Sequence, residues 1–359
     1  MNYRNTKILA EKTLTGSGTE TIDVNIKDII SRIILKWEIT MAGYGMDSYP
    51  HTDITKIELV DGSDVLFSLN GGQCQALCIY DRKIPSLNGG WYVNANNVTS
   101  IYGIDFGRFL FDKLLALDPN VFRNLQLKVT YDSDVMDTGA TEGRLEVLAE
   151  VFDEKVISPV GFLSAKELHS RTPPASGYWY VDLPTDYPIK KMLVQGFYKA
   201  NEPYTVVTEA RLDEDNEKRV PFDWDLEDYE RVMQGEQIPI LERIYGYADT
   251  ASTYAYYTTP SNYSAVLLGN CLDADAYGGP TTILQGGYCT IHLTVNTHLL
   301  GVVSGYLPNH CYEFPFGDQK DLDDWYDVTK LGSLKLRLKA GASGANGTVA
   351  AVLQQLRRY

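Results

Sequence analysis

The chain of 359 residues has few cysteines and no long uninterrupted apolar segment. Its five cysteines are too few, and odd in number, for a disulfide framework, so we expect reduced and mostly buried thiols. No segment approaches the roughly 18 consecutive apolar residues that a membrane-spanning helix needs. The first residues lack the apolar core of a secretory signal. We therefore expect a protein that is made in a host cytoplasm and not exported by the general secretory route.

The chain also has fewer basic than acidic residues. The chain has 32 Lys and Arg against 47 Asp and Glu, which gives a net charge of −15. A surface of that sign repels phosphate backbones, which argues against sequence-specific binding of nucleic acid. Hydrophobic residues make up 44% and charged residues 22%, values of an ordinary folded protein. The length predicts about two domains.

Catalytic and cofactor-binding motifs are missing as well. The sequence contains no G-x-x-x-x-G-K-[ST] phosphate loop, no H-E-x-x-H motif and no G-x-S-x-G nucleophile elbow. The glycines of the early segment G-S-G precede a strand pattern rather than a helix, so they are not a dinucleotide fingerprint. We therefore predict that the protein is not an enzyme, and has no catalytic residue and no cofactor.

The thiols and imidazoles do not form a convincing metal site. Cys289 and His292 point to opposite faces if their segment is an alternating strand, which works against a shared ion. Cys74 and Cys78 are interpreted as buried packing residues. We predict no metal site, although one group of candidate ligands exists: Cys289, His292, His298, His310 and Cys311.

Acidic segments offer one alternative chemistry. DWDLED at 223–228 and DLDDWYD at 321–327 combine carboxylates with aromatic rings that could flank a sugar. Their simpler interpretation is acidic loops at strand ends. The acidic run 213–217 lacks the glycine of a calcium loop, because Lys218 occupies that position, and is expected to be a hairpin tip.

The sequence is rich in strand patterns and in tyrosine, of which there are 25. Apolar and polar residues alternate at 33–40, 125–131, 289–295 and 334–339, and the turn DGSD joins 56–60 to 65–69 as a hairpin. Helical patterns are few and short, at 73–80, 106–117, 164–171 and 225–233. These observations predict an all-β protein made of sandwiches with a few short helices.

An internal repeat divides the chain. Residues 22–35 (IDVNIKDIISRIIL) match 181–194 (VDLPTDYPIKKMLV) without a gap at a shift of 159 positions. Residues 118–129 (DPNVFRNLQLKV) match 327–338 (DVTKLGSLKLRL) at a shift of 209. The first match opens each half and the second closes it, which indicates two tandem sandwiches.

The repeat also predicts the domain boundaries. The first sandwich is expected at 1–158, a linker with a short helix at 159–175, and the second sandwich at 176–359. The two shifts differ by about fifty residues, which we assign to enlarged loops at about 234–287. These loops are expected to be exposed and rich in tyrosine.

Some of these segments resemble a known family. ITKIELVDGSDVLFSL at 54–69, QCQAL at 73–77, WYD at 325–327, KLGSLKL at 330–336 and VLQQLRRY at 352–359 are similar to segments of double jelly-roll major capsid proteins. The family comprises capsid proteins of tailless, membrane-containing icosahedral phages in the adenovirus-like lineage. The lipid-containing single-stranded-DNA phages of flavobacteria are the nearest case. The resemblance covers the opening hairpins and the last thirty or so residues.

The resemblance implies a structural function. It implies two tandem eight-stranded jelly rolls, a homotrimer with a pseudo-hexameric outline, and an icosahedral shell around an internal membrane and the genome. Its partners would be other copies of the chain, minor capsid proteins such as the penton, and the viral membrane. The protein would then be located in the virion capsid.

Two groups of residues are predicted to contact partners. The chain ends are expected on the inner face of the shell, where basic side chains would meet the membrane: Arg4, Lys7, Lys12, Arg357 and Arg358. The enlarged loops are expected on the outer face, with aromatic contact residues: Tyr245, Tyr247, Tyr254, Tyr256, Tyr257 and Tyr263. Two other functions stay open, a carbohydrate-binding or carbohydrate-active sandwich and a virion spike or receptor-binding component.

Overall fold

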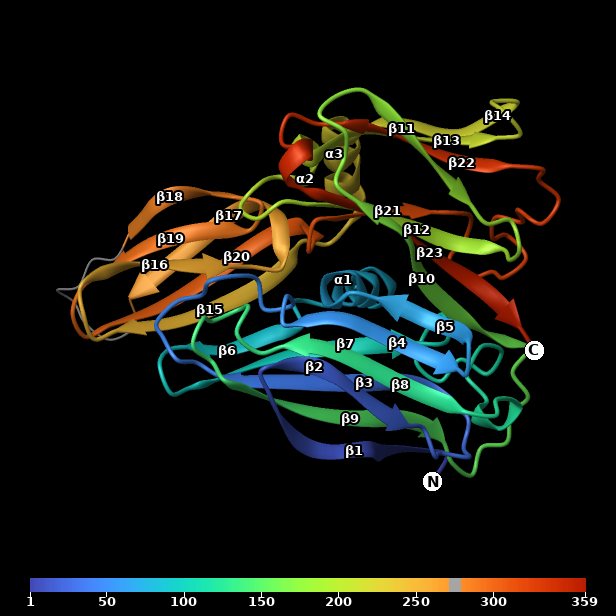
Figure 1. Cartoon of the computed structure of the whole chain (residues 1–359), viewed down its shortest axis with the longest axis horizontal. Coiled ribbons are helices and arrows are strands. Elements are labelled where there is room, and N and C mark those ends of the chain that lie inside the picture. The colour runs from blue at the N-terminus through green and yellow to red at the C-terminus, as the bar shows by residue number, and fades with distance from the viewer. Residues whose placement is uncertain (271–278) are drawn as a thin grey trace.

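The computed structural model describes residues 1–270 and 279–359 (Figure 1). Over these residues the chain is built mainly of β-strands, with three short α-helices. None of the helices in the described part is long and apolar enough to cross a membrane. The all-β prediction is confirmed.

The first half of the chain contains nine strands and one α-helix. In chain order they are β1 (Tyr3–Thr15), β2 (Ser17–Asp23), β3 (Ile30–Thr40), β4 (Ile54–Asp61), β5 (Asp64–Leu69), α1 (Gly71–Arg82), β6 (Asn88–Tyr92), β7 (Asn97–Asp105), the 3-10 turn η1 (Pro119–Val121), β8 (Leu125–Asp132) and β9 (Glu142–Phe152). The predicted DGSD hairpin joins β4 to β5, and Gly62 at its tip has a φ of 60°, which favours glycine.

The second half repeats this sequence of elements and adds to it. Its elements are β10 (Gly161–Arg171), β11 (Tyr178–Leu183), β12 (Ile189–Phe197), α2 (Pro203–Val206), β13 (Val207–Glu214), β14 (Arg219–Asp225), α3 (Leu226–Glu236), β15 (Ile240–Ala248), β16 (Ser252–Tyr257), β17 (Pro260–Asn270), β18 (Gly279–Gln285), β19 (Tyr288–Leu293), β20 (Thr297–Pro308), β21 (Cys311–Pro315), β22 (Leu334–Ala340), η2 (Gly344–Asn346) and β23 (Thr348–Arg358). The acidic run 213–217 ends β13 and enters the turn to β14, as the hairpin prediction requires.

The two halves share one arrangement of strands. In the first half the strand orders are β1-β9-β3-β7 and β2-β8-β4-β5, and in the second half they are β10-β23-β12-β21 and β11-β22-β13-β14. Eight strands in two such sheets form one jelly roll. Figure 1 shows the first roll in blue and green at the bottom and the second roll above it at the right. The fold is therefore two tandem eight-stranded jelly rolls.

The strand registers agree with the repeat that the sequence predicts. Ile22 of β2 pairs with Leu127 of β8, and Val181 of β11 pairs with Leu336 of β22. The shifts of 159 and 209 positions convert the first pair into the second. Burial explains the agreement, because alternate residues of β8 and β22 face the core, and a slip of one residue would turn them outward.

The two rolls are joined edge to edge. β5 pairs in parallel with β10, with Phe67 opposite Ala165, and β6 pairs in parallel with β15, with Trp91 opposite Tyr245. As a result, two eight-stranded sheets run through both halves. One cluster of buried hydrophobic residues likewise extends over both halves. The rolls therefore share sheets and core.

Two of the four predicted helices are present. α1 includes residues 73–80, and α3 includes most of 225–233. α1 begins at Asn70, whose side chain accepts a hydrogen bond from the backbone of Gln73 while the Gln73 side chain accepts from the backbone of Asn70. It ends at Lys83, which has a left-handed φ of 52°. At α3 only the cap side chain takes part: Asp225 accepts hydrogen bonds from the backbone N–H groups of Glu227 and Asp228.

The other two predicted helices are wrong. Residues 164–171 belong to β10, which pairs with β23 on one side and with β5 on the other. Residues 106–117 contain no helix and are held by single bridges, such as Leu117 to Ile30. Both segments have helix-compatible spacing, but pairing with strands distant in the sequence overrides local preference. The expected helical linker at 159–175 is thus largely the opening strand of the second roll.

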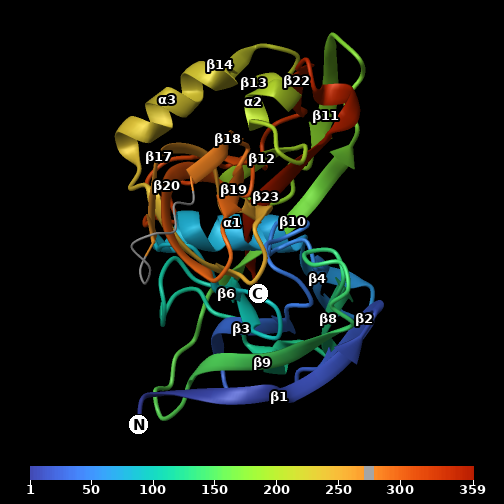
Figure 2. The same ribbon diagram turned by 90° about the vertical axis from the view of Figure 1, so that its left-hand side faces the viewer.

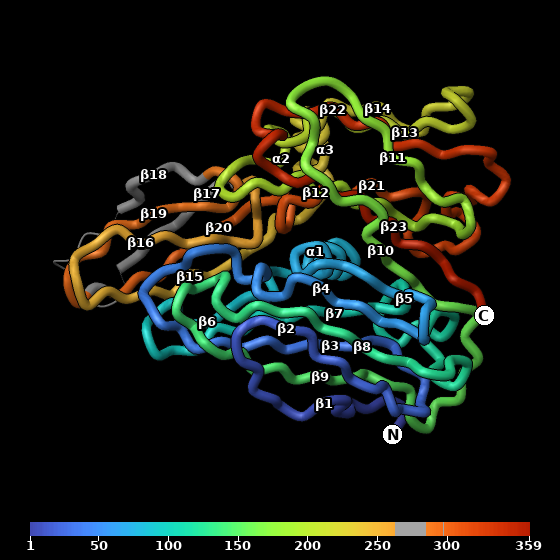
Figure 3. Tube along the Cα trace, in the orientation of Figure 1, coloured from blue at the N-terminus to red at the C-terminus, as the bar shows by residue number. Residues whose placement is uncertain are grey.

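Over the described residues the prediction of loops at 234–287 is also wrong, and residues 271–278 of that range lie outside the described part. The added residues lie between α3 and β21 and form β15 to β20. β15, β20 and β17 extend the first roll's sheet beyond β6, and β16, β19 and β18 form a separate sheet of three strands. The tube in Figure 3 shows β15, β16, β19 and β20 extending side by side away from the rolls. Strand pairing supplies hydrogen-bond partners for a backbone that would otherwise be exposed at the edge of β6.

Candidate functional site

α1 lies between the two rolls (Figure 2). Its polar side chains form ion pairs and hydrogen bonds with the second half. The Asp81 carboxylate is 2.6 Å from the Lys190 ammonium and 2.8 Å from that of Lys191, both on β12. Lys191 also pairs with Glu313 on β21, and Gln354 on β23 donates to Asp81 at 2.8 Å. Both lysine side chains are 2% exposed. This buried ionic cluster ties the first roll to three strands of the second.

The surroundings of the cluster shift the pKa values of Asp81, Lys190 and Lys191. Burial by itself raises the pKa of Asp81, but the charges and hydrogen bonds of Lys190 and Lys191 outweigh it and hold that pKa well below its usual range. Burial lowers the pKa of Lys190. For Lys191 the same burial is outweighed by Asp81 and Glu313, and the pKa lies above its ordinary value. The ionised form of Asp81 is therefore stabilised by two lysines of the other roll, whereas Lys191 has an acidic partner in each roll.

A chain of amide hydrogen bonds runs beside the ionic cluster. Gln73 of α1 donates to Gln195 of β12 at 3.1 Å, and Gln195 donates to the carbonyl of Asn309 at 2.9 Å. Asn309 in turn donates to Gly72 at 3.1 Å and to Gln75 at 3.2 Å. Buried amides cost free energy unless they are paired, so this network favours one docking of α1 against the second roll.

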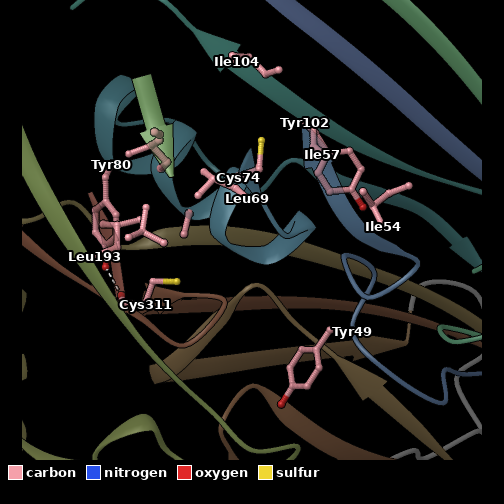
Figure 4. Packing of buried hydrophobic residues seen from close by; sticks show 14 of the residues in the cluster. Tyr49, Ile54, Ile57, Leu69, Cys74, Tyr80, Tyr102, Ile104, Leu193 and Cys311 are labelled. Atoms are coloured by element: carbon pink, nitrogen blue, oxygen red, sulfur yellow. Dashed lines mark hydrogen bonds between the residues drawn. The ribbon is translucent and has the colours of Figure 1, made fainter. Parts of the chain in front are cut away.

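Apolar contacts complete the junction (Figure 4). The Tyr80 hydroxyl donates to the carbonyl of Cys311 at 2.6 Å, and both residues are buried. Cys74 and Cys78 each donate a thiol hydrogen bond to the carbonyl of Gly103, at 3.3 and 2.9 Å. The prediction that Cys74 and Cys78 are buried packing residues is confirmed.

The candidate metal ligands do not converge in the described part of the chain. Cys289 is buried on β19 whereas His292 is exposed, as the alternation predicts. His310 is buried beside Tyr49, and His298 packs on Tyr247. Within residues 1–270 and 279–359, no three His, Cys, Asp or Glu residues are placed to share an ion.

The two aromatic–carboxylate segments meet at one cavity of about 320 Å³. Trp224 comes from the first segment, and Asp324 and Tyr326 come from the second. The rings of Phe222 and Phe314 stack there with centroids 4.5 Å apart. The sequence did not predict this convergence, because it depends on β14 lying beside the loop that follows β21.

The predicted basic ends carry acidic partners. Four of the five predicted cations pair with carboxylates: Arg4 with Asp28 and Asp153, Lys7 with Glu146, Lys12 with Glu20, and Arg357 with Asp64. Arg358 is exposed. Neighbouring side chains therefore supply opposite charge to four of the five cations. The position of the ends on the inner face stays a prediction.

Both chain ends pack on residues 106–117 of the first roll. The ring of Tyr3 stacks on Phe111 with centroids 4.0 Å apart, and the Tyr359 hydroxyl donates to Ala116 at 2.7 Å. Exposed apolar side chains surround this point and form what we call the terminal patch: Phe109, Leu110, Leu114, Val160 and Tyr359. Backbone hydrogen bonds join Val160 to Leu114 and to Tyr359. The ends thus lie together at one end of the first roll.

The predicted outer aromatics fall into different environments. Tyr256 and Tyr257 are buried, so for them the prediction of exposed contact residues is wrong. Tyr245, Tyr247 and Tyr254 are half-buried. Tyr245 stacks on the exposed Trp91 at 5.4 Å. The side chain of Tyr263 lies outside the described residues.

One surface was missed from the sequence. β11 is an edge strand of the sheet β11-β22-β13-β14. Tyr178 and Tyr180 point outward from it and are 48% and 56% exposed. The Arg337 guanidinium lies 4.9 Å from the ring centre of Tyr178. Free strand edges with large exposed rings are typical of contact surfaces. The alternation of 178–183 could have indicated it, but which edge stays open is a property of the assembled sheet.

Solved structures with this arrangement are viral capsid proteins. The chain is similar to the STIV MCP of Sulfolobus Turreted Icosahedral Virus, with a TM-score of 0.60 and 12% identity over 99% of this chain and 97% of that chain. It is also similar to the major capsid protein P2 from Bacteriophage PM2, with a TM-score of 0.56 and 8% identity over 99% and 98%. For the PBCV-1 virus capsid the TM-score is 0.56, with 11% sequence identity over 99% of this chain and 94% of that chain.

The likeness is one of fold. No family model matches the sequence, and no curated protein sequence matches it. Both rolls are included in the structural matches, since each covers 99% of the chain. The chain has the double jelly-roll fold of viral major capsid proteins, as the sequence resemblance implies.

Proposed function

We propose that the protein is a major capsid protein, a structural tile that forms homotrimers and builds an icosahedral shell. The observation that carries this proposal is the repetition of one eight-stranded roll, strand for strand, in a single chain with the fold of capsid proteins over 99% of its length. Three such chains present six similar rolls, which gives a pseudo-hexameric capsomer. The protein acts in the virion capsid after synthesis in the host cytoplasm.

The junction between the rolls supports a tile. Continuous sheets, the buried ionic cluster and the amide network hold the rolls in one relative position. A shell needs such rigidity, because each tile must present the same edges to every neighbour. We further propose the division 1–158 and 159–359, with β10 opening the second roll. The structural function requires no catalytic residue or cofactor.

The partners are proposed from the surfaces. Other copies of the chain would cover the exposed edge of β11, and minor capsid proteins such as the penton would contact the assembled trimers. The chain ends, with Arg4, Lys7, Lys12, Arg357 and Arg358, are proposed to face an internal membrane. Since four of these cations are paired, we expect the apolar terminal patch to contribute more to that contact than charge does.

The test is the assembly state of the purified protein. We expect a particle of three 40.2 kDa chains by light scattering, with a pseudo-hexagonal outline in electron micrographs. A monomer at all concentrations would contradict the proposal. A lipid-containing phage of flavobacteria is the proposed source, and cryo-electron microscopy of such a virion would place the chain ends relative to the membrane.

A carbohydrate-binding function is a second candidate, favoured by the cavity that joins Trp224, Asp324 and Tyr326. It predicts a monomer whose thermal midpoint rises with an added glycan. A trimer that shows no such rise with any of a panel of bacterial surface glycans would exclude it. The same panel tests the spike or receptor-binding alternative.

A further inference from the structure

A cavity of about 430 Å³ opens beside the buried ionic cluster. It lies where α1, α3, β12 and β21 come together, and its apolar walls are Tyr80, Tyr229 and Met233. The volume is in the usual range for pockets that bind small organic molecules, roughly 300–1,000 Å³. The capsid function does not use this cavity.

The lining of the cavity has the opposite charge balance to the protein as a whole. It contains five basic and three acidic side chains, in a chain of net charge −15. Arg108 is neutralised by a close pair with Asp112, and Lys190 and Lys191 are held by Asp81 and Glu313. The other two basic residues, Lys83 and Lys320, lie at the rim and form weaker ion pairs or none among the described residues.

The rim lysines are available to a ligand. Lys83 is 3.8 Å from Glu313, and its side chain is 53% exposed. Lys320 is exposed and has no acidic partner among the described residues. The two ammonium groups come from opposite sides of the junction, one from the end of α1 and the other from the loop after β21. Both ammonium groups line the same cavity, so an anion bound at its rim would be attracted by each of them.

A second, apolar cleft adjoins the first cavity. It has a volume of about 200 Å³ and shares Tyr80, Lys83 and Gln237 with the larger cavity. Its walls are apolar, and two of them, Ile238 and Leu241, are 74% and 53% exposed. Exposed aliphatic side chains around a cleft are a common mark of a binding site. The combined site has a cationic end and an apolar end.

We propose that the two cavities together bind a small amphiphilic anion, with its carboxylate, sulfonate or phosphate group between Lys83 and Lys320 and its apolar body in the cleft of Ile238 and Leu241. A neutral ligand would leave the ammonium groups unused. An inorganic anion would leave the apolar cleft empty. The ligand would bridge the two rolls, because Lys83 belongs to the first and Lys320 to the second.

The probe for the test is 1-anilinonaphthalene-8-sulfonate, an amphiphilic anion whose fluorescence rises on binding. N-phenyl-1-naphthylamine is the matched control, since it has the same rings without the sulfonate. We expect saturable binding of the sulfonate with one site per chain and clearly weaker binding of the neutral compound. Decanoate should displace the sulfonate probe, whereas acetate, which lacks an apolar body, should not.

The variant Lys83→Gln/Lys320→Gln tests the residues. Both side chains are at the rim, so the fold should be retained, which circular dichroism and the thermal midpoint verify. We expect binding of the sulfonate to weaken roughly fivefold to tenfold, while binding of the neutral compound changes less than about twofold. Lys330→Gln is the control, because Lys330 is 88% exposed and lies outside both cavities.

Three results would overturn the proposal. One is the absence of saturable binding of the sulfonate by the folded wild-type protein. Another is equal weakening of both compounds in the double variant, which would mean that only the apolar surface matters. The third is equal loss in Lys330→Gln, which would mean that net charge alone acts.

Discussion

The carboxylate of Asp81 on α1 lies 2.6 Å from the ammonium of Lys190 on β12, a residue 109 positions further along the chain. The pair crosses from the first jelly roll to the second and is closed off from water. Lys191 joins the same carboxylate at 2.8 Å. One carboxylate of the first roll thus contacts two cations of the second, and Glu313 supplies the other negative charge of the cluster. The relative position of the rolls is therefore sensitive to Asp81.

Replacing Asp81 should destabilise the protein strongly. Asp81→Ala leaves Lys190 and Lys191 buried with Glu313 as their remaining acidic partner, and removal of one member of a buried ion pair costs about 3–5 kcal/mol. Urea unfolding at pH 7 measures the change. The control is Asp182→Ala, whose carboxylate is 86% exposed and 3.7 Å from Lys335. The control should change stability by less than about 1 kcal/mol, and equal effects of the two variants would contradict the role of the cluster.

Stability should decrease as the pH rises through neutrality. Burial, with a smaller contribution from the charge of Glu202, raises the pKa of Glu230 to about 8, from an ordinary 4.5. Between these values the folded protein holds a proton that the unfolded chain has released, so each rise in pH favours unfolding. The contribution is on the order of 2–4 kcal/mol. It is fully present below the unfolded pKa and lost above the folded one.

The variant Glu230→Gln isolates this effect. Its amide cannot ionise, so the difference in urea midpoint between about pH 5 and pH 8.5 should be smaller than in the wild-type protein. Glu242, whose pKa burial raises to about 7, should keep part of the slope in both proteins. Identical slopes for the variant and the wild type would show that Glu230 is not buried in a protonated form.

Tyr256 should behave as a core residue. Its side chain is fully buried, and the centres of the Tyr256 and Tyr92 rings lie 6.3 Å apart. This contact joins the added strand β16 to β6 of the first roll. Tyr256→Ala should cost about 3 kcal/mol or more, because it opens a large cavity. Tyr254→Ala, in the same strand but half-buried, should cost clearly less. Thermal unfolding compares the two variants. A loss of stability in Tyr256→Ala no larger than that in Tyr254→Ala would contradict the buried position of Tyr256.

The edge of β11 should be part of the trimer contact. The double variant Tyr178→Ser/Tyr180→Ser removes two rings that are 48% and 56% exposed, so the monomer should fold normally. We expect the trimer to dissociate at a concentration at least about tenfold higher than for the wild type. Val220→Ser on β14, at the other edge of the same sheet, is the control. Sedimentation at several concentrations makes the measurement, and an unchanged trimer would place the contact elsewhere.

The internal repeat could be read from the sequence because burial constrains it. The isolated bridge between Ile30 and Leu117 has its counterpart in that between Ile189 and Tyr326. The shifts of 159 and 209 positions convert one bridge into the other. Alternating apolar residues that must face a core cannot slip by one position without exposing that core. The pattern therefore carries both the strand class and the register.

The position of the added strands could not be read in this way. Burial alternates along β15 and β19, but alternation does not say which sheet a strand joins. β15 pairs with β6 of the first roll in parallel, a contact between residues far apart in the sequence. The helix predicted at 164–171 was wrong for the same reason. Pairing with β23 and β5 determines the conformation of this segment more strongly than its helix-like spacing does.

The sequence alone determined the all-β class, the two tandem sandwiches, the equivalence of matched segments in the two halves and the lack of a recognisable catalytic motif. Each of these depends on local alternation or on a match between two segments. Only the tertiary structure decided that Asp81 meets Lys190 and Lys191, that Lys83 and Lys320 share a cavity, and that Tyr256 is buried. These contacts join elements whose approach depends on how whole sheets pack, and no local pattern of side chains records that packing.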